Sequence, residues 1–332
     1  MSSDRSLRSR LAQYSDKLVN QTDYARVQAT ASAIHEILRC AGDFELRDMN
    51  RDGMDYFGAA AFPPGYNTNR KCSRGEGIAL NPTNAAECIV NDPYRTRQFI
   101  AGVRKTVEEK VAQATSPVKL LYAGTGPFAP LVCANLHLFD PSTVKIYFMD
   151  INSYSIDTVF KIMYNLGYQN FQAEYIVGDA TDYKLSFKPD VLVTETMNLG
   201  LLYEPQYWIS KNLSPQMAED GVVVPRQVKV SMHGQDLSKG NELGKKVDLG
   251  EVVTVRKDGD LNVTTDFEVP ATLRGVDARF TLVTEIEVAE GVEIHPNETQ
   301  ITMDYIVHSG FWNNGKIETD YRPGKQFARV RT

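Results

Sequence analysis

The sequence predicts an α/β protein: a doubly wound parallel sheet, with a helical segment before it and an antiparallel β-domain after it. Between Val118 and Val193, short apolar runs that end near Gly, Asp or Glu alternate with helical stretches, as in parallel α/β sheets. After Pro215 the runs are β-branched and often alternating, which is typical of an antiparallel sandwich or barrel. The first 50 residues repeat apolar side chains at three-to-four spacing, which predicts helices.

We therefore divide the 332 residues into three parts. Residues 1–88 hold the helices and a loop, residues 89–222 form the doubly wound domain, and residues 223–332 form the β-domain. The loop covers residues 51–88 and is rich in Gly, Pro, Asn and aromatics; a connection this long is either functional or disordered. Its aromatic side chains, Tyr56 among them, favour a segment that orders over a substrate pocket.

Composition and charge exclude several classes of binding partner. The net charge of −6 argues against nucleic acid and suits a cationic substrate, although so small a charge is a weak indication. Four cysteines lack CxxC or CxxH spacing, which indicates reduced thiols in a cytoplasmic protein and no metal site. We expect no membrane partner, because no apolar run has the length of a signal peptide core or a membrane span.

A helix is predicted over Asp92–Val111, with Asp92 as its N-cap and Pro93 in its first turn. Arg95 and Arg97 lie near its start, where a positive charge opposes the helix dipole. Their presence is better explained by a ligand carboxylate or by a salt bridge, and spacing alone leaves both open.

A glycine turn, Gly124-Thr125-Gly126, directly follows the apolar strand Val118–Tyr122. The segment from Pro127 can begin a helix because proline is tolerated in a first turn. Strand, glycine turn and helix in this order favour a ligand site, since glycines allow close backbone approach and a helix start offers free amide hydrogens. The next strand ends at Asp150, where a carboxylate can accept both hydroxyls of a ribose. A third strand ends at Gly178-Asp179-Ala180.

The loop after the next strand carries two carboxylates, Glu195 and Glu204. If the loop folds back, they can face one another across a space the size of a planar cation. Two buried carboxylates repel, and one would hold a proton unless a cation lies between them. A guanidinium is flat, permanently charged and matched to bidentate carboxylate contacts. We therefore predict a guanidine-binding site. The loop alone is equally compatible with an ordinary surface loop that carries two solvated glutamates.

Three segments resemble the protein arginine methyltransferase family, over roughly residues 85–235. NDPYRTRQFIAGV is similar to the family's D-x-x-R-T-x-x-Y/F segment, and AEDGVVVP is similar to the D-G-x-x-x-P segment that precedes its β-barrel. ETMNLGLLYE resembles the double-glutamate loop E-x-M-x-x-x-L-x-x-E, with Glu195, Met197, Leu201 and Glu204 in register. Three matches in the family's order are more specific than the glycine turn alone.

The resemblance implies a Rossmann-like class I methyltransferase domain that binds S-adenosyl-L-methionine, followed by a β-barrel or sandwich. It implies that Arg95 binds the methionine carboxylate and that Glu195 and Glu204 are the catalytic pair that holds the guanidinium. The remaining candidates are Gly124, Thr125, Gly126, Asp150, Asp179 and Ala180 for the cofactor, and Met197, Tyr56 and Trp312 for the substrate.

Departures from the family pattern bear on the substrate. Tyr122 stands where the family usually has an acid, and Thr196 stands where the family often has an aromatic residue. The nearest candidate for the family's Thr-His-Trp loop is His308–Trp312, whose spacing differs. Residues 235–300 are predicted to form strands and turns, so the family's helical dimerisation arm is not expected there. These changes favour free arginine or a related small molecule, as in the branch of arginine N-methyltransferases that serves streptozotocin-type antibiotic pathways. The alternatives are peptidyl arginine, another natural-product substrate and a non-catalytic cofactor-binding regulatory partner. We expect a homodimer, with the first helices as the candidate contact.

Overall fold

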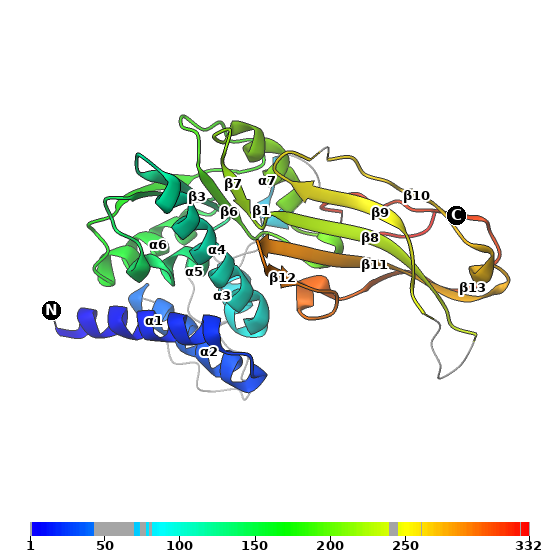
Figure 1. The fold of residues 1–332 in the computed structure, drawn as a ribbon, viewed down its shortest axis with the longest axis horizontal. Coiled ribbons are helices and arrows are strands. Elements are labelled where there is room, and N and C mark those ends of the chain that lie inside the picture. Colours follow the sequence, from blue (N-terminus) through cyan, green and yellow to red (C-terminus); the bar gives the residue numbers. More distant parts are fainter. Residues whose placement is uncertain are drawn as a thin grey trace.

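The computed structural model describes residues 2–42, 70–73, 78–79, 82–238, 245–259, 261–325 and 327–331. The doubly wound domain lies between the N-terminal helices and an elongated β-domain (Figure 1). Most of the predicted loop, including Tyr56, lies outside the described residues. No helix in the described ranges has the length and apolar character needed to cross a bilayer.

Two N-terminal helices, α1 (Ser2–Asn20) and α2 (Tyr24–Ala41), confirm the helical prediction. Asp23 caps α2 by accepting a hydrogen bond from the Arg26 amide at 3.0 Å. The apolar stripe of α2 is buried, and Gln28 donates to the Val90 carbonyl at 2.7 Å. The two helices therefore pack on this chain's own doubly wound domain (Figure 1).

The prediction of one loop over residues 51–88 is wrong for its last part. Residues 82–91 form helix α3 (Pro82–Asn91), and a short hairpin pairs β1 (Arg70–Lys71) with β2 (Ile78–Ala79). The glycine- and proline-rich composition of the whole segment hides a ten-residue helix at its end. The predicted boundary between residues 88 and 89 consequently falls inside α3.

Helix α4 (Pro93–Gln113) follows α3 and begins as predicted, with Asp92 as its N-cap. The helix packs closely on the β-domain at Gly102, where a Cβ atom would lie 2.5 Å from Cγ1 of Val288. Only a glycine allows this approach without a shift of the strand. Gln98 adds a hydrogen bond to the Glu293 carbonyl at 2.6 Å. The position of α4 is therefore set from both domains.

The doubly wound domain is built on a five-stranded parallel sheet in the order β5-β4-β3-β6-β7. Its strands are β3 (Val118–Ala123), β4 (Val144–Asp150), β5 (Gln172–Val177), β6 (Val191–Thr194) and β7 (Val222–Val224). The chain runs outward from β3 to β5 and then returns to β6 on the other side of β3. This reversal is the switch point at which open α/β sheets bind ligands, beyond the carboxyl ends of their strands.

The helix predicted directly after the glycine turn begins later and is short. Ala129 has a left-handed backbone (φ 41°), and α5 (Pro130–Cys133) starts only after it. Helix α6 (Ser153–Asn165) is capped by Asn152, which accepts from the Tyr154 amide at 3.0 Å. Helix α7 (Gln206–Leu213) was not predicted and follows the double-glutamate loop.

The β-domain has five antiparallel strands in one sheet, in the order β12-β11-β8-β9, with β13 also beside β11. A two-stranded ribbon accompanies this sheet, an arrangement closer to the predicted sandwich than to a closed barrel. The strands are β8 (Gln227–Asp236), β9 (Val247–Arg256), β11 (Val276–Ala289), β12 (Val292–Ile294) and β13 (Tyr305–Trp312), with β10 (Asp266–Glu268) and β14 (Lys316–Glu318) in the ribbon.

The sequence pattern predicts a strand over residues 300–307, and this prediction is wrong for the first part of that range. Residues 300–302 form a short helical turn, η5 (Gln300–Thr302), and β13 begins only at Tyr305. The turn is closed by a capping box in which Thr299 and Thr302 satisfy each other's amides. Turn η5 lies against the start of α4, where the Gln300 amide donates to Asp92 Oδ2 at 2.9 Å.

Candidate active site

One cavity lies at the switch point of the parallel sheet. It is lined by both glutamates, Glu195 and Glu204, by Met197 from the predicted substrate set, and by every predicted cofactor residue, that is, Arg95, Gly124, Thr125, Gly126, Asp150, Asp179 and Ala180. These residues come from α4, from the ends of three strands and from the loop before α7. Cys72, Cys88, Tyr122 and Thr196 also line it.

Trp312 does not belong to this site, and its assignment to the substrate is corrected. It ends β13 at the far end of the β-domain (Figure 1). Its ring packs edge-on against Phe280 and His308, with centroids 5.2 Å and 5.1 Å away. Its indole nitrogen donates to the Asn314 carbonyl at 2.9 Å. The side chain is part of the hydrophobic core, and its one polar group, the indole N–H, is satisfied outside the cavity.

The glycine turn requires its glycines. Gly124 and Gly126 have φ angles of 78° and 56°, a region that other residues rarely adopt. A Cβ atom on Gly124 would also lie 2.2 Å from Cγ2 of Thr196. The amide of Gly126 donates to Asp150 Oδ2 at 2.9 Å. The turn is therefore held between the ends of β4 and β6.

Asp150 and Asp179 are both held by backbone amides. Asp150 is 9% exposed, and besides Gly126 it accepts from the Asn152 amide at 2.8 Å. Burial would raise the pKa of Asp179, but hydrogen bonds from Ser73 and Thr181 lower it overall. Ser73 belongs to the turn between β1 and β2, so this hairpin reaches the cavity wall.

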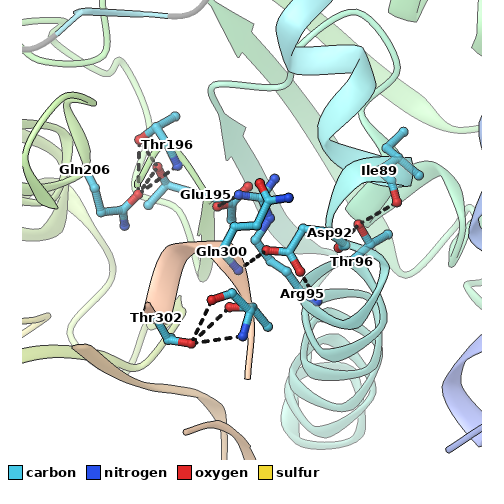
Figure 2. Close-up of polar contacts among 11 residues, drawn as sticks. Ile89, Asp92, Arg95, Thr96, Glu195, Thr196, Gln206, Gln300 and Thr302 are labelled. Atoms are coloured by element: carbon cyan, nitrogen blue, oxygen red, sulfur yellow. Dashed lines mark hydrogen bonds and ion pairs between the residues drawn. The ribbon is translucent and has the colours of Figure 1, made fainter. Parts of the chain in front are cut away.

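Arg95 forms an ion pair with Glu195 at the cavity wall, with Nη1 and Oε1 separated by 3.5 Å. The arginine is 7% exposed. Burial alone would lower its pKa, but the charges of Glu195, Cys88 and Asp92 raise it, so the guanidinium stays charged. Figure 2 shows Arg95 beside Glu195, with Asp92 and Gln300 close to it. The start of α4 thus holds a cation at the carboxylates.

The two glutamates are the least satisfied charges of the cavity. Burial raises the pKa of Glu195 to about 7 although Arg95 opposes this. Burial, together with the charge of Glu195, raises the pKa of Glu204 to about 8. Oε1 of Glu195 has no hydrogen-bond partner among the described residues. Keeping a carboxylate ionised away from water is costly, and a bound cation would lower that cost beyond the single ion pair with Arg95.

The loop between the glutamates folds back on itself. The Gln206 amide donates to the Thr196 carbonyl at 3.0 Å, which closes the loop at its base. At its tip, the Gly200 amide donates to Thr284 of β11 at 3.1 Å, and Tyr321 donates to the Gly200 carbonyl at 2.9 Å. The loop is thus tied to both domains.

Tyr122 and Cys88 are among the cavity side chains that were not predicted as site residues. Tyr122 is 3% exposed, and burial and the charge of Glu195 raise its pKa well above 10, so it remains a neutral phenol. Burial likewise raises the pKa of the Cys88 thiol. Tyr122 could have been found as the inward residue just before the glycine turn. Cys88 could not have been found, because it lies in α3, in a stretch whose composition predicts a loop.

The fold and cavity define a doubly wound α/β protein with an appended antiparallel β-domain and a ligand site at the sheet's switch point. No protein-family model matches the sequence, and no curated protein matches it. The solved structures that are similar include two at 12% identity, and each likeness covers 68% of this chain and 84% of the solved chain. They are a Trypanosoma brucei PRMT1 enzyme–prozyme heterotetrameric complex with AdoHcy (TM-score 0.42) and Arabidopsis thaliana protein arginine methyltransferase 10 in an open conformation (TM-score 0.43). A likeness this distant assigns no function, so the chemistry rests on the residues of this chain.

Proposed function

We propose that this chain is an S-adenosyl-L-methionine-dependent N-methyltransferase that acts on a guanidino nitrogen. The observation that carries the proposal is the pair of partly buried carboxylates, Glu195 and Glu204, in one cavity with Arg95 and a glycine turn. Loss of hydration raises their pKa values to about 7 and 8, although the charge of Arg95 opposes this. A guanidinium supplies a permanent charge and several coplanar donors.

The residues around the glycine turn fit the proposed cofactor. Arg95 would hold its carboxylate and Asp150 its ribose hydroxyls, while Asp179 and Ala180 would lie beside its adenine. The place of Asp150 at the end of β4, in the cavity wall, and the glycine-only backbone of Gly124 support this fit. When bound, S-adenosylmethionine supplies an electrophilic methyl group on a sulfonium sulfur.

The glutamates would act by orientation and charge. A guanidinium nitrogen is a poor nucleophile because its lone pair is delocalised. Carboxylates that bind the other nitrogens draw positive charge toward themselves and leave one nitrogen free to react. Either carboxylate could then accept the proton that this nitrogen loses, since raised pKa values favour proton uptake at neutral pH.

Free arginine, or a related small guanidine, is the substrate we propose. The support is the phenol of Tyr122 at the cavity wall, the small Thr196 where an aromatic is usual in the resembling family, and the cover that α3 and the β1–β2 hairpin provide. A role in an antibiotic pathway and a homodimer are part of the same proposal and rest on the resemblance, whereas a cytoplasmic location rests on the cysteine pattern.

Isotope-labelled cofactor tests the proposal with three acceptors: free arginine, a glycine-arginine-rich peptide and free lysine. We expect mass spectrometry to find a labelled methyl group on the guanidino group of arginine and none on lysine. If the peptide is methylated and free arginine is not, the proposed reaction would stand and peptidyl arginine would replace free arginine as the substrate. Cofactor binding without transfer to either guanidine would overturn the proposal.

A further inference from the structure

We propose that Gln206 is a positioning residue that fixes the two carboxylates relative to each other and to the glycine turn. The proposal rests on the guanidino methyl transfer proposed above. Gln206 does not line the cavity. Its side chain instead closes the base of the loop that carries Glu195 and Glu204, as Figure 2 shows for Gln206 and Thr196.

The amide oxygen of Gln206 accepts three hydrogen bonds. It accepts from the Thr196 amide at 3.1 Å, from the Thr196 hydroxyl at 3.0 Å and from the Thr194 hydroxyl at 3.3 Å. In return, the backbone amide of Gln206 donates to the Thr196 carbonyl at 3.0 Å. Gln206 is 1% exposed, so these contacts are protected from water. We call this set of contacts the Gln206 clamp.

The clamp joins the two residues that matter most for the placement of the carboxylates. Thr196 directly follows Glu195, and Gln206 comes two positions after Glu204. Holding Thr196 to Gln206 therefore fixes both ends of the loop next to the two acids. Because the acids must hold different nitrogens of one planar cation, a small change in their separation removes one of the contacts.

Thr196 also connects the clamp to the proposed cofactor site. Its methyl group occupies the space into which a Cβ on Gly124 would project, at 2.2 Å. A shift of Thr196 would therefore alter the surface of the glycine turn together with the position of Glu195. One side chain, Gln206, thus sets the geometry between the methyl donor site and the guanidine site.

The chemistry of the clamp allows a matched pair of substitutions. All three partners of the Gln206 oxygen are donors, so the position needs an acceptor of this length. Gln206→Glu keeps an acceptor, whereas Gln206→Met keeps the length and apolar packing but cannot replace the three bonds. The loop tip stays anchored through Thr284 and Tyr321 in both variants, so the loop is displaced at its base without being released.

Gln216→Met is a control for the loss of a partly buried, hydrogen-bonded glutamine. Gln216 lies just after α7, accepts from the Leu185 amide at 2.9 Å and donates to the Tyr183 and Asn212 carbonyls at 3.1 Å and 2.8 Å. It belongs neither to the cavity nor to the loop. We expect Gln216→Met to leave kcat and the protection of the Thr196 amide within about twofold of the unsubstituted protein.

Two readouts test the clamp on the full chain. In Gln206→Met we expect kcat to fall by about 10- to 100-fold, the order of loss that a misplaced reacting group causes, while the cofactor Kd changes much less. Hydrogen exchange of the Thr196 amide should accelerate by at least about tenfold, as the loss of one hydrogen bond predicts. Gln206→Glu should restore most of both properties. If Gln206→Met does not fold, Thr196→Val removes one bond, retains the methyl group and should lower kcat by about fivefold.

The outcomes separate this proposal from the proposed function. A Gln206→Met protein with kcat within twofold of the unsubstituted protein, or a Gln206→Glu protein as impaired as Gln206→Met, would disprove the clamp. The methyl transfer would then still stand. If the unsubstituted protein methylates no guanidine, the proposed function fails and with it the positioning role, whereas unchanged exchange at Thr196 in Gln206→Met would refute the clamp by itself.

Discussion

The guanidinium of Arg95 and the carboxylate of Glu195 lie 3.5 Å apart, between Nη1 and Oε1, at the wall of one cavity. In the proposed function Arg95 binds the cofactor and Glu195 binds the substrate. Their ion pair therefore joins the two sites directly. Changes at either residue should affect the other site through charge, and this connection underlies the predictions below.

Glu195→Gln and Glu204→Gln should each lower kcat by at least about 100-fold, the usual cost of removing one electrostatic contact to the reacting group. For Glu204→Gln the cofactor Kd should change by less than about threefold, because the ion pair of Arg95 is made with Glu195. Steady-state kinetics with arginine and calorimetry with S-adenosylhomocysteine measure the two quantities. Glu318→Gln, on the exposed edge of β14, is the matched control. A Glu204→Gln enzyme that retains normal turnover would remove this acid from the mechanism.

Arg95→Ala should weaken cofactor binding by about 10- to 100-fold, because a charge-assisted contact to a carboxylate is lost. It should also raise the pKa values of the glutamates, since Arg95 is the cation that lowers both. Arg97→Ala is the control two positions away. The Arg97 guanidinium donates to Gln98 and to the Val19 carbonyl, outside the cavity. Equal losses in both variants would point to damage of α4 instead of a lost cofactor contact.

Activity should rise with pH between about 6 and 8. The pKa values of about 7 and 8 belong to carboxylates that must be ionised to hold a guanidinium. Protons are thus released when arginine binds near neutral pH. Calorimetry of arginine binding in two buffers of different ionisation enthalpy should measure that release. An arginine affinity independent of pH over this range would argue against carboxylates with raised pKa values.

The ligand-free protein should lose stability as pH rises from about 5 to 8. The folded-state pKa values of Glu195 and Glu204 lie above the value of 4.5 for a free side chain, so the folded state binds protons more tightly than the unfolded state. The stabilisation is complete below the unfolded pKa and is lost as pH passes the folded values. We expect a loss on the order of 1–3 kcal/mol per group at most. Urea unfolding of a Glu195→Gln/Glu204→Gln protein should show a smaller pH slope; an unchanged slope would assign the effect elsewhere.

Asp92→Ala should lower the free energy of unfolding by about 1–2 kcal/mol. Asp92 is 4% exposed and accepts from the Arg95 amide in α4 and the Gln300 amide in η5. Its loss removes a helix cap and leaves a β-domain amide unpaired. Asp92→Asn retains an acceptor for these amides and should be milder. Thermal and urea unfolding give the comparison, and an Asp92→Ala protein as stable as the unsubstituted one would mean that water replaces both contacts.

Much of the cavity could be predicted from the sequence, because strand ends in a parallel sheet bring distant motifs to one edge. Arg95, Asp150 and Glu195 are far apart in the chain but follow, or face, neighbouring strand ends. Helix α3 could not be predicted from segment composition, since a few helical turns are outweighed by the glycines and prolines before them. The assignment of Trp312 to the substrate site was wrong for another reason. A short motif match indicates residue types but does not show which end of a β-domain they occupy.

Gln206 illustrates what a sequence leaves out. A glutamine two positions after a glutamate carries no pattern, and its role becomes visible only when the loop folds back onto Thr196. The same holds for Thr196 and Gly124, whose close contact is set by the packing of β3 against β6. Local sequence indicates the acids, whereas the contacts that place them depend on tertiary structure.

A crystal structure with S-adenosylhomocysteine and arginine tests the central claim most directly. The account predicts that nitrogens of one guanidinium lie within hydrogen-bond distance of both the Glu195 and the Glu204 carboxylates, with Arg95 on the cofactor side. A guanidinium bound elsewhere, or in contact with neither carboxylate, would contradict it.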